Sequence, residues 1–356
     1  MKPIRFITLI IALIAIIGAI YWLEAKKGPR VAATEIPAPK IASPQVPSGY
    51  PRAKEIVAPS GFVNTVPFTL AQFVGKKVIL LDFMTYSCIN CQRTYPYLNA
   101  WWDKYKDHGL LIVGIHTPEF DFEKNINNVR AAAVKYGLKF PLVLDNDHGS
   151  WNAYENSYWP REYLIDIYGN IIHDQIGEGN YGETESAIQK ALKARNEALG
   201  LKDEVVPGGL VNPSSVIEMD ASKIKSQETY FGSARNSFLG SGIPGLSGIQ
   251  TMPAPKNMKA DVLYLTGQWN IQAEYAENKS AGAVITYRYS SKNVYLVGSS
   301  KAGVKLKVLL DGKPLAPVLV KEERLYKIVE GADYGEHALE ITIEGPGLRA
   351  YTFTFG

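Results

Sequence analysis

The sequence predicts an α/β fold with a central, partly parallel sheet, followed by an all-β sandwich of jelly-roll type. Strand and helix signals alternate over residues 60–198, which is typical of a sheet covered by helices. Short alternating segments rich in β-branched and aromatic residues fill residues 227–356, as in antiparallel sandwiches. A single transmembrane helix is predicted ahead of both domains. The length of 356 residues suits about two domains.

The N-terminal residues 1–23 are predicted to be an uncleaved signal anchor. Residues 6–23 form an unbroken run of 18 apolar or small residues, which is long enough to span a bilayer as a helix. Basic residues flank both ends, so the positive-inside rule leaves the orientation open. A cleaved signal peptide is the alternative, although its best cleavage motif, Val31-Ala32-Ala33, lies far downstream. Residues 24–59 carry seven prolines among small residues and are predicted to be an extended tether.

The elements of the α/β domain follow from apolar runs and their boundaries. Residues 78–83 and 110–115 are largely apolar and predict buried strands. One helix is predicted from Cys88 to about residue 107, and a second over residues 122–136, which Gly137 ends. The remaining predicted elements are strands at residues 140–144, 163–166 and 171–175, a tight turn at Tyr168-Gly169-Asn170, and a closing helix over residues 182–195.

The chain has two cysteines, and they lie three residues apart as Cys88-Ile89-Asn90-Cys91, directly after a predicted strand. At a helix N-terminus, free backbone N–H groups and the helix dipole stabilise the Cys88 thiolate. Cys91 lies one turn later on the same face, from where it can resolve a mixed disulfide. A zinc site needs about four ligands, and the chain has neither a second cysteine pair nor suitably spaced histidines. The pair is therefore predicted to be redox-active, and no cofactor or metal is expected.

Several separate motifs resemble the thioredoxin-like domain of DipZ-type proteins, a group close to the TlpA-like thioredoxins of cytochrome c biogenesis. The motifs are residues 82–96 around the cysteines, residues 116–120, residues 144–147 and Tyr158-Trp159-Pro160. The resemblance extends from about residue 64 to residue 356, and it implies a thioredoxin-like fold with protein thiol or disulfide clients. DipZ-type proteins often carry a CcdA electron-transfer module, which this sequence lacks. The electron donor is therefore expected to be a separate CcdA- or DsbD-like membrane protein.

The resemblance also assigns three residues beside the cysteines. Asp82 matches the acid that lies beneath the cysteine pair and relays the proton of the resolving thiol, and burial would raise its pKa toward neutrality. The alternative for Asp82 is a strand-end carboxylate paired with backbone donors. Glu119 matches an acid near the active site of TlpA-like domains, or else it neighbours a helix N-cap. Pro160 matches the cis-proline that faces the disulfide, although Trp159 departs from the small residue or threonine usual before it.

The all-β domain, residues 227–356, follows a predicted linker over residues 199–226. Its predicted strands cover residues 261–265, 268–275, 282–289, 293–297, 304–310, 324–329, 337–343 and 350–355, with a hairpin turn at Asp311-Gly312. The matching region of DipZ-type proteins resembles a carbohydrate-binding module. Four aromatic residues are therefore candidates for stacking on sugar rings, although alternating aromatic residues also fill sandwich cores. They are Trp269, Tyr275, Tyr287 and Tyr289.

The leading interpretation is a thiol–disulfide oxidoreductase held in the inner membrane by a single span, with both folded domains in the periplasm. It would act as a reductant in cytochrome c biogenesis or in envelope thiol maintenance, although the direction of electron flow stays open. The net charge is only +3 and the sequence has no block of basic residues. The basic patch typical of nucleic-acid-binding proteins is therefore missing, and no nucleic-acid partner is predicted.

Two other functions compete with this interpretation. A thiol peroxidase is the first, because Thr85-x-x-Cys88 matches the peroxiredoxin pattern, although Leu81 stands where that pattern has proline. A cell-wall glycan-binding protein with a thioredoxin-like scaffold is the second. That function would leave an intact Cys-x-x-Cys without a purpose.

Overall fold

The computed structural model describes residues 49–202 and 209–356, and these described residues belong to one compact unit. The predicted anchor, most of the predicted tether and part of the predicted linker lie outside the described residues. In the part of the chain that is described, no helix is long and apolar enough to cross a bilayer.

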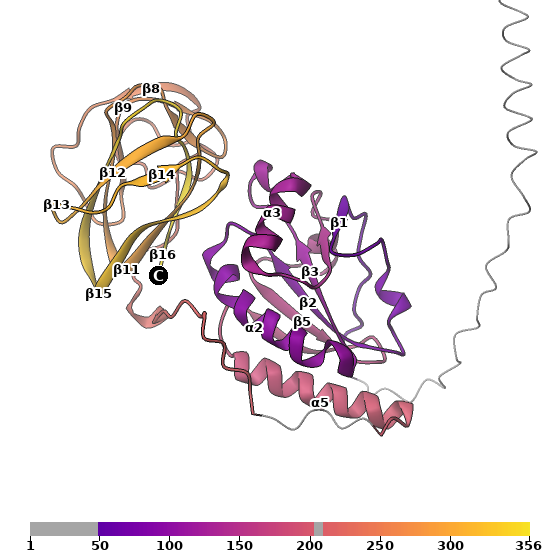
Figure 1. The fold of residues 1–356 in the computed structure, drawn as a ribbon. Coiled ribbons are helices and arrows are strands. Elements are labelled where there is room, and N and C mark those ends of the chain that lie inside the picture. Colours follow the sequence, from indigo (N-terminus) through magenta and orange to yellow (C-terminus); the bar gives the residue numbers. More distant parts are fainter. Residues whose placement is uncertain (1–48, 203–208) are drawn as a thin grey trace, which may run out of the picture. The chain divides into compact units, whose positions relative to one another are not determined.

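The N-terminal half contains a six-stranded mixed sheet in the order β1-β4-β3-β2-β5-β6 (Figure 1). The central strand β2 pairs in parallel with β3 and antiparallel with β5, so the predicted α/β fold is confirmed. The strands are β1 (Gly61–Val63), β2 (Val78–Met84), β3 (Leu110–His116), β4 (Leu142–Leu144), β5 (Arg161–Ile165) and β6 (Ile171–Ile176). The sequence did not predict β1, which is a short strand at the edge of the sheet.

Three helices pack on one face of this sheet: α2 (Ile89–Tyr105), α3 (Ile126–Tyr136) and α5 (Tyr181–Leu199). The crossovers through α2 and α3 step in the same direction along the sheet, so right-handed connections place both helices on the same side. Asn125 caps α3, because its side chain accepts a hydrogen bond from the Asn127 amide N–H at 3.0 Å. The predicted single helix over residues 122–136 is therefore divided at Asn125.

Short elements cover the opposite face or extend the helices. The short helix α4 (Gly149–Ala153), which was not predicted, contributes Trp151 to the apolar cluster on the opposite face. The 3-10 segments are η1 (Leu70–Gln72), η2 (Lys106–His108), η3 (Asp121–Lys124) and η4 (Ala221–Lys223). The connection that contains α4 leads from β4 to β5 across the sheet, which explains why its apolar residues lie on the face away from α2.

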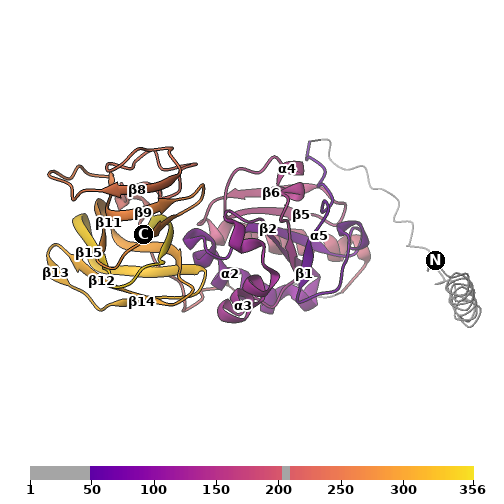
Figure 2. The same ribbon diagram turned by 90° about the horizontal axis from the view of Figure 1, so that it is seen from above.

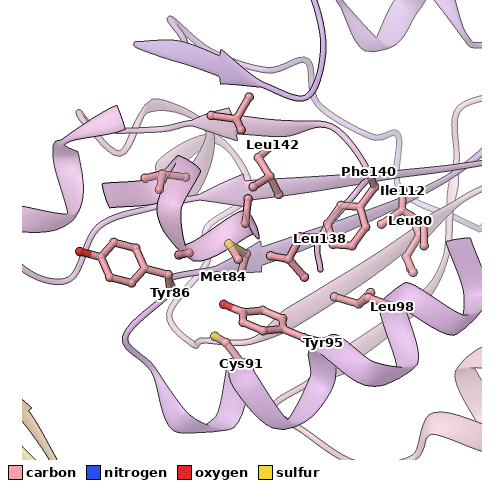
Figure 3. Packing of buried hydrophobic residues seen from close by; sticks show 14 of the residues in the cluster. Leu80, Met84, Tyr86, Cys91, Tyr95, Leu98, Ile112, Leu138, Phe140 and Leu142 are labelled. Carbon is pink, nitrogen blue, oxygen red and sulfur yellow. The ribbon is translucent and has the colours of Figure 1, made fainter. Parts of the chain in front are cut away.

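The active-site helix α2 buries a stripe of side chains against the sheet. Figure 3 shows Cys91, Tyr95 and Leu98 on the side of α2 that faces Leu80 and Met84 of β2. These five residues are at most 2% exposed, and burial of a leucine of this kind stabilises the fold by about 1.5–3 kcal/mol. The packing fixes the rotation of α2 and therefore directs Cys91 into the interior.

The C-terminal half is a β region with one network of ten strands, two of which lie off its main path (Figure 2). Two long strands dominate it, β11 (Ala283–Ser299) and β15 (Arg324–Ile343). The others are β7 (Thr229–Tyr230), β8 (Gly248–Met252), β9 (Leu263–Ile271), β10 (Ala276–Asn278), β12 (Val304–Leu310), β13 (Lys313–Pro314), β14 (Val318–Val320) and β16 (Arg349–Phe355). The predicted all-β region is confirmed, as is the Asp311-Gly312 turn, where both residues have positive φ between β12 and β13.

The hydrogen-bonded network differs from two separate sandwich sheets. The first half of β11 pairs with β9 and its second half pairs with β16, while β10 joins β16 to β9. The network therefore closes on itself. Register shifts after Ser291 and Val294 let β11 bend, which is why two predicted strands form one continuous strand.

The aromatic residues proposed for sugar stacking do not form an exposed face. Trp269, Tyr287 and Tyr289 are at most 2% exposed and belong to the core of the β region, so the stacking prediction is wrong for them and the core-filling alternative holds. Tyr275 is partly buried and packs against Tyr351, with 5.2 Å between the ring centroids. Glycan binding by this region stays a prediction without those three residues.

Candidate active site

Cys88 is the N-cap residue of α2 and has an extended backbone with φ −75° and ψ 124°. Its carbonyl accepts the Gln92 amide N–H at 3.1 Å, and no side chain caps the first turn. The helix dipole and the free amides of that turn can therefore stabilise negative charge at the Cys88 sulfur. The Cys88 side chain is partly exposed, which makes it the accessible thiol of the pair.

Cys91 lies one turn into α2 and is fully buried. Both cysteines are free thiols. Burial raises the pKa of the Cys91 thiol well above its ordinary value, and the hydrogen bond with Cys88 raises it further. Cys91 therefore holds its proton until a nearby base removes it, and it cannot react first with a client.

Trp159 lies beside Cys88, and Pro160 follows it directly before β5. The Trp159–Pro160 peptide bond is cis, and the Trp159 carbonyl oxygen is 4.0 Å from Cys88 Sγ. The Trp159 indole donates to the Thr117 carbonyl at 3.1 Å and stacks near Trp151 with 4.2 Å between ring centroids. Trp159 thus occupies a fixed position beside the accessible thiol.

Asp82 lies on β2 and is fully buried on the face that α2 covers. Neither of its carboxyl oxygens has a hydrogen-bond partner among the described residues, which contradicts the alternative of a carboxylate paired with backbone donors. Burial raises the pKa of Asp82 to about 7. Asp82 also interacts electrostatically with Cys91, so a base with a pKa near neutrality lies close to the thiol that must lose a proton.

Glu119 lines a cavity of about 260 Å³ together with Cys88 and Trp159. Two residues of the β half line the same cavity and hold the Glu119 carboxylate: the Tyr230 hydroxyl donates to it at 2.9 Å and the Arg235 guanidinium at 2.8 Å. Glu119 also fits the other prediction, that it neighbours a helix N-cap, because Phe120 is the N-cap residue of η3. The predicted acid therefore lies at the cysteine site, and residues of the β half fix its position.

Two buried ionisable side chains that the sequence analysis did not single out hold the loop before Cys88. The Tyr86 amide donates to His116 Nε2 at 3.4 Å, and the Ser87 hydroxyl donates to the Glu123 carboxylate at 2.6 Å. Burial lowers the pKa of His116 to about 4 and raises that of Glu123 to about 7. An acid at the start of a helix is ordinarily explained by its favourable interaction with the helix dipole. The sequence therefore offered no sign that Glu123 reaches the cysteine loop.

Known proteins share both halves of this chain. Residues 52–174 match the AhpC/TSA family and residues 226–356 match the thioredoxin-like C-terminal domain family. Protein DipZ of Mycobacterium tuberculosis is 34% identical over 310 residues, covering 85% of this chain and 43% of that protein. The thiol–disulfide oxidoreductase YkuV of Bacillus subtilis is 30% identical over 124 residues, covering 35% of this chain and 83% of YkuV. The chain belongs to the DipZ/TlpA-like thioredoxin family.

The predicted family and its thioredoxin-like fold are therefore confirmed. ResA of Bacillus thuringiensis, also named a thiol–disulfide oxidoreductase, is 29% identical over 133 residues, covering 35% of this chain and 73% of ResA. Membership of a family of thiol–disulfide oxidoreductases is likewise confirmed. The chain spans less than half the length of the DipZ proteins it matches. Among the described residues, no cluster of three or more His, Cys, Asp or Glu side chains is arranged to hold a metal ion.

Proposed function

We propose that this protein is a thiol–disulfide oxidoreductase in which Cys88 attacks and Cys91 resolves. The observation that carries this proposal is the pairing of a partly exposed thiol at the N-terminus of α2 with a fully buried thiol one turn later. The two positions suit different steps, because attack on a client requires access and resolution requires proximity to Cys88.

The reaction consists of two exchange steps. The Cys88 thiolate attacks one sulfur of a client disulfide, so the client S–S bond breaks, a mixed disulfide forms and the first client thiolate leaves. Cys91 then gives its proton to Asp82, and its sulfur attacks Cys88. The mixed disulfide breaks, the second client thiolate leaves and the Cys88–Cys91 disulfide forms. The client disulfide has gained two electrons, and the cysteine pair has lost two.

We further propose that the chain is anchored in the inner membrane and acts on protein clients in the periplasm. Support comes from the apolar run over residues 6–23 and from the similarity to DipZ. A CcdA- or DsbD-like membrane protein would return electrons to the Cys88–Cys91 disulfide, and cytochrome c biogenesis or envelope thiol maintenance would be the process served. Thiol trapping in cells with and without such a donor tests this proposal, since a pair that is reduced regardless of the donor contradicts it.

Thiol peroxidase activity is the second candidate function, because residues 52–174 match the AhpC/TSA family. A peroxidase would consume hydrogen peroxide at Cys88 without any disulfide client. The buried resolving cysteine one turn away favours disulfide exchange. Measurement of peroxide consumption against disulfide exchange in the same preparation separates the two activities.

Cysteine substitutions test the division of labour between the two thiols. We expect Cys91→Ser to accumulate mixed disulfides with clients, because Cys88 still attacks and nothing resolves the product. Cys88→Ser should accumulate none, because the remaining thiol is buried. The measurement is gel mobility under non-reducing conditions, with the double serine variant as the control. Equal trapping by both single variants would contradict the assignment.

A further inference from the structure

A second buried acid, Glu162, lies directly beside Asp82. The two residues are register partners on the neighbouring antiparallel strands β2 and β5. Side chains of directly opposed residues point to the same face, with their Cβ atoms about 4.5–5.5 Å apart. Asp82 is 0% exposed and Glu162 is 2% exposed. Two carboxyl groups are therefore neighbours in the interior, on the face that α2 and α5 cover.

The surroundings of this pair cannot support two negative charges. No hydrogen bond of normal geometry reaches any of the four carboxyl oxygens in the described part of the chain, and no ion pair there involves either acid. Burial raises the pKa of Glu162 well above its ordinary value, and the charge of Asp82 raises it further. Neighbouring carboxylates in such a place retain a proton between them.

The polar groups around Glu162 lead toward the surface. On α5, the Thr184 hydroxyl stabilises the charged form of Glu162, and it lies 3.1 Å from His173 Nε2 on β6. His173 is partly exposed, whereas Thr184 is buried. The other titratable groups facing the pair are Cys91 and Tyr95 on α2, which interact with Asp82, and Tyr181 on α5, which interacts with Glu162.

We propose that Asp82 and Glu162 share a proton, and that Glu162, Thr184 and His173 form the route by which the Cys91 proton leaves the interior. The inference rests on the proposed exchange function. Cys91 transfers its proton to Asp82 while the electron pair of the S–H bond stays on sulfur, so the acid pair briefly holds two protons. Glu162 then releases its own proton through Thr184 and His173 to water, and the pair is left with one shared proton as before. Glu162 does not touch the reacting sulfur atoms. It acts through Asp82, by sharing its proton, and is therefore a positioning residue.

The test uses the full chain and a chromogenic aromatic disulfide, dithiobis(nitrobenzoate). Release of the first aromatic thiolate reports attack by Cys88, and release of the second reports resolution by Cys91. We expect Glu162→Gln to leave the first phase unchanged and to slow the second by about 10-fold at pH 7, because no carboxyl group then releases a proton toward Thr184 as Asp82 accepts one from Cys91. Glu185→Gln is the matched control, since Glu185 is a buried acid of α5 that pairs with Lys104. An unchanged second phase in Glu162→Gln would overturn the route.

Infrared spectroscopy tests the shared proton independently of exchange activity. The wild type should keep a protonated carboxyl C=O band above pH 7, and Asp82→Asn should shift the frequency of that band because the sharing carboxylate is gone. An unshifted band in Asp82→Asn would place the proton on Glu162 alone. Glu162→Gln should lose that band, while Glu185→Gln should retain it. A band that persists unchanged in Glu162→Gln would refute the shared proton. A wild type without a Cys91-dependent second phase would instead overturn the proposed function, so the two failures are distinguishable.

Discussion

The two halves of the molecule treat buried polar groups in different ways. Around the cysteines, the α/β half buries acids that lack ordinary partners, such as Asp82 and Glu162. The β half buries neutral amides and hydroxyls, and its fully buried Asn278 makes three hydrogen bonds. Paired groups stabilise a fold, whereas unpaired buried acids destabilise it and acquire a pKa suited to proton transfer. This difference indicates that the α/β half carries the groups for proton transfer, whereas the buried polar groups of the β half stabilise the fold.

Among the variants that test this difference between the halves, Asp82→Asn is expected to have the largest effect on the rate of disulfide exchange. We expect the second phase of disulfide exchange to slow by about 100-fold, because the amide cannot accept the Cys91 proton, while attack by Cys88 is unchanged. Stopped-flow measurement of the two thiolate releases checks this. Asp103→Asn, an exposed change in the same helix α2, is the control. Similar slowing of both phases would make Asp82 a structural residue.

The same variant should change how stability depends on pH. Burial raises the pKa of Asp82 from 3.8 to about 7, so between about pH 4 and pH 7 the folded state keeps a proton that the unfolded state releases. The free energy of unfolding of the wild type therefore falls as pH rises through this window. Asp82→Asn lacks this loss and should be more stable than the wild type above pH 7, by up to about 4 kcal/mol. Urea unfolding at pH 4 and pH 8 measures the difference.

In the β half, Asn278→Ala should affect stability alone. The Asn278 side chain donates to the carbonyls of Ser280 and Gly345 and accepts the Leu348 amide N–H, at 2.8–2.9 Å. Alanine leaves those groups unpaired in the interior, so we expect a loss of roughly 3 kcal/mol. A lower urea midpoint at constant slope, with both exchange phases unchanged, is the expected result. Asn257→Ala, an exposed change in the same half, serves as the control, and a changed exchange rate would break the comparison.

Local sequence features predicted the part of the site that local structure creates. An apolar run followed by Cys-x-x-Cys fixes a strand, a helix N-terminus and the two thiols within one stretch of chain, and the structure has β2 and α2 there. Asp82 lies in the same stretch, and the resemblance to thioredoxin-like domains assigned its role. Tyr168-Gly169-Asn170 and Asp311-Gly312 were likewise recognisable, because residues in the left-handed region mark tight turns.

The remaining site residues depend on contacts between distant segments. Glu162 becomes a partner of Asp82 only through the register of β2 and β5, and Glu123 reaches Ser87 only because η3 folds back over the loop. Composition cannot show either. In the same way, the sequence left Tyr287 open to a sugar-binding face or, as alternating aromatic residues more often do, to the core, and the structure buries it completely.

The smallest effect is expected from Arg235→Gln, and it tests whether the β half does more than support the fold. Arg235 pairs with Glu119, and its guanidinium lies 3.7 Å from the centroid of the Tyr230 ring. The Arg235 side chain is 40% exposed, so the ion pair should contribute less than about 1 kcal/mol to stability. Tyr230 still holds Glu119 in the variant, and the fold should be unchanged.

The informative measurement for Arg235→Gln is the attack rate on disulfides of opposite charge. Arg235 lines the cavity that contains Cys88, so its positive charge should favour the anionic dithiobis(nitrobenzoate) over the cationic cystamine. We expect the ratio of the two rates to fall several-fold, and to fall less at high salt because exposed charges are screened. Arg288→Gln is the matched control, because Arg288 is a similarly exposed arginine of the β half that does not line this cavity. An unchanged ratio would confine client selection to the α/β half, whereas a lowered ratio would make the β half part of the active site.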